Sequence, residues 1–179
     1  MTSSLNKGVG KVQVTLRWDP SPAGAPDHDL DIIAAVYPQE DPHGTPVYLV
    51  HFGSRSPDGT ITLDRDSRTG QGFGSDEVMT LELERLSPAY GRVVVGVAIQ
   101  QGGGRIAFAD VAGGQVAVKE GYQELDNLRL ADLGPATAAT IAEFTRADGG
   151  TGGWRWSRSL RGFDADPRSF TELMGGAAG

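Results

Sequence analysis

The sequence predicts an all-β fold, an antiparallel β-sandwich of about nine to ten strands with room for one short C-terminal helix. Apolar residues mostly recur at every second position, which is the spacing of half-buried strands. The 26 glycines and 10 prolines among 179 residues indicate many turns. No domain boundary interrupts this pattern, so we expect a single domain over residues 1–179 with a sizeable core.

The first three predicted strands lie before residue 53. Apolar and polar residues alternate over residues 10–18, as in a strand with one buried face. Residues 30–37 form a nearly continuous apolar run that ends at Pro38, so this strand is expected to be buried on both faces. Residues 47–52 form a further short strand. Residues 53–77 show almost no apolar periodicity and are expected to form a loop.

Four more strands are predicted after this loop, before residue 131. Apolar residues alternate with polar ones over residues 79–84, and residues 93–99 are rich in β-branched side chains. Residues 115–119 and 124–130 have the pattern of a hairpin that turns around Gly121.

The last two predicted strands and the helix lie after residue 135. The alanines of residues 136–144 suit a helix, but the β-branched residues among them favour a strand. Residues 154–160 alternate aromatic and basic side chains, and the two tryptophans are expected in the core. A short helix is expected over residues 166–174, where Asp166 can cap the first turn. The apolar residues that would share one face of this helix are Phe170, Leu173 and Met174.

Composition excludes several classes of function. The chain has no cysteine, so it has no disulfide, thiolate metal site or cysteine nucleophile. Its 23 acidic and 16 basic residues give a net charge of −7, which disfavours nucleic-acid binding. No apolar run approaches the roughly 18–20 residues of a membrane span, and the start lacks the apolar segment of a secretory signal. We therefore expect a cytoplasmic protein with no direct membrane insertion.

The informative segment is the acidic loop at residues 56–77. It holds five carboxylates, and three aspartates precede it at residues 27–31. Crowded carboxylates repel one another unless they are solvated, protonated or share a cation. Glycines in the loop let the backbone bend so that carbonyl groups can join such a site. These hard oxygen donors favour Ca²⁺ as the cofactor, although a solvated loop balanced by Arg65 and Arg68 is the alternative reading.

The loop is not an EF-hand. Counting from Asp64 places Arg68 at the fifth position and Thr69 where the EF-hand requires glycine. Counting from Asp66 places Arg68 at the third position. A different calcium-binding architecture is needed.

Residues 56–77 resemble, without a gap, the motif S-P-D-G-S-V-x-H-x-G-D-N-x-T-G-x-G-x-G-D-D-E of the TerD-like tellurite-resistance and stress-response proteins of bacteria. The residues that fall on motif positions are Ser56, Pro57, Asp58, Gly59, Asp66, Thr69, Gly70, Gly72, Gly74, Asp76 and Glu77. The similarity extends to residues 4–8, 16–19 and 29–31, and to Trp154-Arg-Trp156 near the end.

This resemblance implies a Ca²⁺-binding β-sandwich linked to tellurite, oxidative or envelope stress, with membrane-associated protein partners of the same system. The side-chain ligands that it implies are Asp29, Asp31, Asp66 and Asp76, followed by Glu77, with Asp58 as a further matched acidic residue. Backbone carbonyls around Thr69, Gly72 and Gly74 would complete the shell. Ser67 and Ser75 stand where the family carries Asn and Asp, so a second metal site would be lost or weakened here.

No pattern of an enzyme is present. The three histidines are His28, His43 and His51, and no nucleophile elbow or zinc-binding helix motif accompanies them. The glycines at 70, 72 and 74 lack the Lys-Ser/Thr of a phosphate loop. We expect a non-enzymatic calcium-binding protein whose ion orders the acidic loop for a partner. Two alternatives remain open, a module that binds a small ligand or anion and a calcium-independent scaffold subunit.

Overall fold

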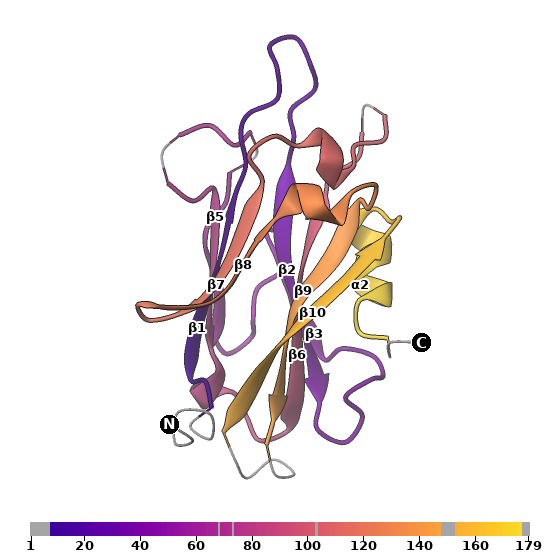
Figure 1. The fold of residues 1–179 in the computed structure, drawn as a ribbon. Coiled ribbons are helices and arrows are strands. Elements are labelled where there is room, and N and C mark those ends of the chain that lie inside the picture. Colours follow the sequence, from indigo (N-terminus) through magenta and orange to yellow (C-terminus); the bar gives the residue numbers. More distant parts are fainter. Residues whose placement is uncertain (1–7, 68, 73, 103, 148–152, 177–179) are drawn as a thin grey trace.

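Two antiparallel five-stranded sheets pack face to face to form a β-sandwich (Figure 1). The computed structural model describes residues 8–67, 69–72, 74–102, 104–147 and 153–176. The first sheet has the order β4-β5-β1-β7-β8, and the second has the order β10-β9-β6-β2-β3. The strand bounds are β1 Lys11–Arg17, β2 Leu30–Pro38, β3 Tyr48–Val50, β4 Ile61–Arg65, β5 Glu77–Glu82, β6 Tyr90–Ile99, β7 Gln115–Glu120, β8 Gln123–Arg129, β9 Ala138–Arg146 and β10 Trp154–Phe163. Short 3₁₀ turns at Leu83–Arg85, Phe108–Asp110 and Leu130–Leu133 connect some of them.

The two sheets bury a common apolar core. Along β1, buried Val12, Val14 and Leu16 alternate with polar residues, as a strand with one core face requires. β1 pairs with β5 on one side and with β7 on the other. The predicted β-sandwich is therefore confirmed.

β2 is buried on both faces, as its apolar run predicts. Residues such as Ile32 belong to the core between the sheets, whereas Ile33 and Tyr37 face outward under the helix α2 (Pro167–Leu173). Phe170 and Met174 complete this second apolar cluster. Figure 1 shows α2, in yellow, beside the second sheet and close to the C-terminal end of the described chain.

The predicted cap of α2 is present. The backbone N–H of Ser169 donates to Asp166 Oδ1 at 2.8 Å, and Pro167 occupies the first turn. The expectation that Leu173 shares the buried face is wrong, since 49% of this residue is exposed. The helix has seven residues, and Phe170 and Met174 fill the narrow stripe that meets the sheet.

β4 is a strand that the sequence analysis placed in a loop. It forms the edge of the first sheet, where Ile61 is buried and Leu63 packs against the core. The next residue, Asp64, is exposed and accepts a hydrogen bond from the Thr80 hydroxyl on β5. Two apolar residues in a five-residue edge strand are too few to stand out as a periodic pattern.

Both tryptophans of β10 pack in or against the apolar core. Trp154 is 2% exposed and lies under the guanidinium of Arg146, 4.5 Å from the ring centroid, while Trp156 is partly buried against the core. The neighbouring Arg158 pairs with Asp126 on β8.

Candidate metal centre

The candidate site lies at the edge of the second sheet, just beyond the end of β3. β3 has only three residues and pairs with Ala34 to Val36 of β2. On this side of β2, opposite β6, the N–H of Ile32 therefore has no strand to pair with. Glu77, at the start of β5 in the first sheet, reaches across and accepts a hydrogen bond from that N–H through Oε1 at 2.9 Å. A side chain of one sheet thus caps the backbone of the other.

Three carboxylates meet at this point. One oxygen each from Asp31, Asp66 and Glu77 lies within 4.8 Å of the others. Asp31 comes from β2, Glu77 from β5, and Asp66 directly follows β4. Asp31 and Glu77 are 2% and 0% exposed, whereas Asp66 faces solvent. Within the described ranges, no other group of three or more acidic or histidine residues is close enough to hold a metal ion.

Glu77 has the strongest electrostatic perturbation at the site. Its pKa is raised to about 11: burial is the largest cause, the Ile32 N–H acts in the opposite direction, and the nearby Asp31 and Asp66 add to the rise. Its second oxygen, Oε2, is buried and accepts no hydrogen bond from any described residue. A buried carboxylate oxygen without a donor requires a proton or a cation. The residues present therefore fit a cation.

Gln100 orients one of the three carboxylates. It follows the last residue of β6 and donates from Nε2 to Asp31 Oδ2 at 2.6 Å. Its backbone N–H also donates to the carbonyl of Asp29 at 2.8 Å, which extends the pairing of β2 with β6. Gln100 did not emerge from the sequence because only the pairing register brings it beside Asp31.

Asp76, a predicted ligand, lies outside the cluster. Its Oδ2 accepts the backbone N–H of Trp18 at 2.8 Å, and its own N–H donates to the carbonyl of Leu16 at 2.8 Å. These two bonds continue the pairing of β1 with β5 beyond Glu77. Burial raises the pKa of Asp76, and the Trp18 hydrogen bond opposes that effect. The geometry gives Asp76 a structural role at the end of the strand pair.

Two further predicted ligands, Asp58 and Asp29, are not members of the group of three carboxylates. Asp58 Oδ1 accepts hydrogen bonds from Ser56 Oγ and from the N–H and hydroxyl of Thr60, at 3.1, 3.1 and 2.6 Å, so it stabilises a local turn. Asp29 is half-buried one residue before β2 and is not a member of the cluster.

One of the predicted loop positions, Gly70, packs against Trp18. Gly70 has φ +77°, and a Cβ there would lie 2.6 Å from Trp18 Nε1. Thr69 Oγ1 accepts the backbone N–H of Gln71 at 3.3 Å. Gly72 and Gly74 also have positive φ, as the bending inferred from the sequence requires. Gly70 is therefore the described loop position that is buried against the core, whereas Gln71, Gly72 and Gly74 are exposed.

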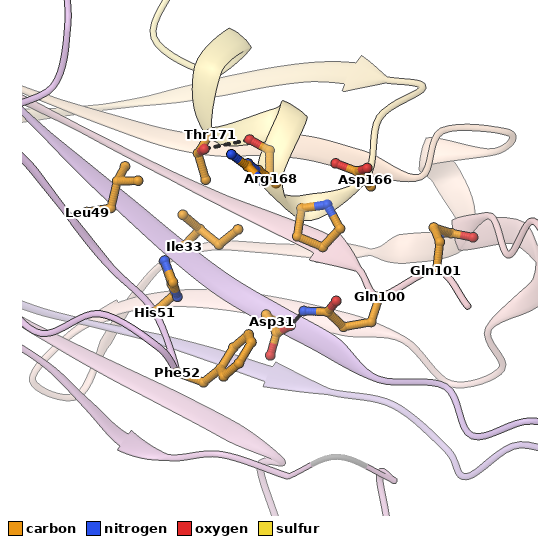
Figure 2. A pocket seen from close by; sticks show the side chains of 11 residues that line it. Asp31, Ile33, Leu49, His51, Phe52, Gln100, Gln101, Asp166, Arg168 and Thr171 are labelled. Carbon is orange, nitrogen blue, oxygen red and sulfur yellow. Dashed lines mark hydrogen bonds between the residues drawn. The ribbon is translucent and has the colours of Figure 1, made fainter. Parts of the chain in front are cut away.

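Two cavities border the three carboxylates. A cavity of about 500 Å³ has Asp31 in its wall, and another of about 450 Å³ has Asp66 in its wall. His51 and Phe52, which follow β3, line both cavities. Figure 2 shows the first cavity, with Asp31 and Phe52 on one side and Arg168 and Thr171 of α2 on the other. The carboxylates are therefore next to space that a small molecule can enter.

The fold and the cluster together define a β-sandwich domain with an acidic site where its two sheets meet. The sequence model of the TerD domain matches residues 2–166, so the chain belongs to the TerD family. The resemblance seen in the acidic loop is thus confirmed. No helix in the part of the chain that the structure describes is long and apolar enough to cross a membrane.

Relatives of this chain include solved structures. One is a homologue of telluride resistance protein (TerD) from Streptomyces coelicolor A3(2), whose sequence is 53% identical to this chain. The two structures superpose with a TM-score of 0.92, and the match covers 96% of this chain and 100% of the homologue. The structure of SAV2460, a protein of unknown function, is 49% identical, with a TM-score of 0.93 and the same coverage. The tellurium resistance protein TerD of Serratia marcescens is 26% identical over 165 residues, which cover 83% of this chain and 86% of that protein.

Proposed function

We propose that this TerD-family protein binds calcium in a bacterial stress response of the tellurite-resistance type, and that it is not an enzyme. One observation carries the proposal. The buried Oε2 of Glu77 accepts no hydrogen bond from the described residues, and Glu77 shares a 4.8 Å cluster with Asp31 and Asp66. A divalent cation would neutralise the repulsion among these groups and give that oxygen a partner.

The donor set favours calcium over other cations. The cluster offers only carboxylate oxygens, and softer metals prefer the sulfur and imidazole donors that it lacks. Ca²⁺ accepts about six to eight oxygens in irregular geometry, whereas Mg²⁺ requires a near-ideal octahedron. Asp31, Asp66 and Glu77 would hold the ion. The carbonyls of Thr69, Gly72 and Gly74 remain our expected additional ligands.

The ion would link the two sheets. Asp31 belongs to the second sheet, while Glu77 and Asp66 belong to the first sheet and its edge. Binding to the folded state alone stabilises it by about 2.7 kcal/mol when the free ion is at a hundredfold excess over its Kd. The ion would also order the loop between Asp66 and Asp76, and we propose that this ordered loop presents a surface to membrane-associated partners in the cytoplasm.

The direct test is a calcium titration of the full chain, followed both by calorimetry and by thermal unfolding. We expect saturable binding and a rise in melting temperature that magnesium at equal concentration does not reproduce. A concentration of about 5 mM calcium is far above the Kd range of most intracellular calcium sites. If it does not change the melting temperature, the proposed calcium binding is wrong.

A pull-down with and without calcium tests the interaction role. We expect at least one partner to be retained only when calcium is present. A partner set that chelation leaves unchanged would favour a calcium-independent scaffold instead.

A further inference from the structure

The cavity beside Asp31 extends beyond the proposed calcium site and shares only Asp31 with it. At about 500 Å³, it has the size of pockets that hold small molecules. Its lining comes from β2, from β3 and the residues after it, from the segment after β6, and from the start of α2. Asp31 belongs both to the cavity wall and to the three carboxylates, so a small ligand in the cavity would lie next to the candidate metal site.

One part of the wall is apolar. Ile33 and Leu49 lie on the sheet side, and Pro167 opens α2 opposite them. Phe52, also in the wall, is 54% exposed. An apolar group the size of one ring would cover Phe52 and remove this exposed surface from water.

The polar part of the wall contains one cationic side chain, Arg168. Within the described chain Arg168 forms no salt bridge, and its guanidinium lies on the α2 side of the cavity, across from Asp31 (Figure 2). His51 adds a neutral donor. Its Nδ1 accepts the N–H of Gly53 at 3.1 Å, so the ring proton is on Nε2.

We propose that this cavity binds a small organic oxyanion, a carboxylate or a phosphate on an apolar body, whose oxygens share the calcium ion with Asp31 while Arg168 contacts the same charged group. This inference rests on the proposed function. Carboxylate and phosphate oxygens are hard donors that bind Ca²⁺, and both match the planar fork of arginine. Phe52, Leu49 and Pro167 would enclose the apolar body.

Charge makes calcium a condition for this binding. Without the ion, Asp31, Asp66 and Asp166 place negative charge around the cavity, and an anion is repelled. With the ion bound, the anion meets a divalent cation on one side and Arg168 on the other. The structure thus predicts an ordered process in which calcium binds first and the organic anion second.

The test uses the full chain with phenyl phosphate and phenylacetate as probes, and benzyl alcohol as the neutral control. Calorimetry and ligand-observed NMR measure binding to calcium-saturated protein and to protein treated with a chelator. We expect at least one anion to bind the calcium form with affinity about tenfold or more higher than the chelated form, and benzyl alcohol to bind more weakly than that anion. Comparison of the two anions identifies the preferred oxyanion.

Variants assign the binding to this cavity. We expect Arg168→Gln to weaken anion binding about tenfold, because a charge-assisted hydrogen bond is lost, while the calcium isotherm stays unchanged. Phe52→Ser should also weaken the binding of both anions, because the apolar wall is lost. Arg155→Gln, at an exposed position on β10, is the matched control and should change neither isotherm.

The outcomes separate this inference from the proposed function. Normal calcium binding with no anion binding at about 10 mM probe, a concentration that detects even millimolar affinity, would overturn the inference alone. Anion binding that survives chelation, or that Arg168→Gln leaves intact, would also overturn it. Absence of calcium binding would overturn the proposed function and, with it, the shared ion.

Discussion

Arg158 on β10 donates from Nε to Oδ2 of Asp126 on β8 at 2.8 Å, and a second hydrogen bond joins Arg158 Nη2 to Asp126 Oδ1. β8 and β10 are the outer strands of different sheets. This two-pronged ion pair therefore ties the two sheets together on the side of the sandwich opposite β3 and β4. The carboxylate is only 8% exposed, whereas the guanidinium is 50% exposed.

Asp126→Asn should destabilise the fold by about 0.5–1 kcal/mol at pH 7, because the pair is partly screened by solvent. The Arg158 hydrogen bond and charge lower the pKa of Asp126 from its usual 3.8. A lowered carboxyl pKa gives stability that is present above pH 3.8 and is lost as pH falls through the folded-state pKa. Urea unfolding at pH 7 and pH 3 measures this difference.

The control for that prediction is a double-mutant cycle with Arg158→Gln. If the two side chains act as a pair, the double variant should lose less stability than the sum of the losses in the two single variants. Equal effects of Asp126→Asn at both pH values would show that the ion pair contributes nothing.

Glu77→Gln should abolish the calcium response without unfolding the protein. Burial raises the pKa of Glu77 to about 11, so in the absence of a cation this carboxyl is protonated at neutral pH and glutamine is a close substitute. Wild type should gain about 5–10 °C in melting temperature at a hundredfold excess of calcium over Kd. Thermal scans with calcium and with chelator provide the measurement.

Glu40→Gln is the matched control for Glu77→Gln, since Glu40 is exposed and is not a member of the cluster. It should keep the full calcium response. A Glu77→Gln protein that still gains stability with calcium would show that Glu77 is not a ligand.

Asp66→Ala and Asp76→Ala should behave differently although both residues match the family motif. Asp66 is exposed and belongs to the cluster, so its loss should remove calcium binding and leave the metal-free stability nearly unchanged. Asp76 accepts the Trp18 N–H, so its loss should cost about 1–3 kcal/mol with or without calcium. Denaturant unfolding in both conditions distinguishes the two, and identical profiles would contradict the assignment.

Gly70→Ala should disturb the loop more than Gly74→Ala. Both glycines have similar positive φ, +77° and +79°, so both substitutions carry about 1–2 kcal/mol of backbone strain. Only at Gly70 would the added Cβ meet other atoms, 2.6 Å from Trp18 Nε1. A shift of tryptophan fluorescence in Gly70→Ala that is absent in Gly74→Ala would support this contact.

The sequence predicts the fold well because the strands carry local signals. The run at residues 30–37 and the cap at Asp166 depend on neighbouring residues alone, and both expectations hold. β4 escaped prediction because its stability comes from pairing with β5, and Leu173 was misplaced because the width of the contact with the sheet is a tertiary property.

The site was predictable only in part. The acidic residues are visible in the sequence, but which of them converge depends on sheet register and on the length of β3. Asp31, Asp66 and Glu77 meet, whereas Asp76, which precedes β5, accepts the backbone N–H of Trp18 instead. Gln100 and the cavity wall at Phe52 follow from the pairing of distant segments.

Glu77 occupies a place beside β2 that a longer β3 would otherwise fill. Its Oε1 accepts the Ile32 N–H that a neighbouring strand would otherwise accept, while Oε2 is free for the proposed ion. If the proposal holds, one side chain both binds metal and protects the sheet edge. Any replacement chosen to tune calcium affinity would also alter how well the rim of β2 resists pairing with another polypeptide.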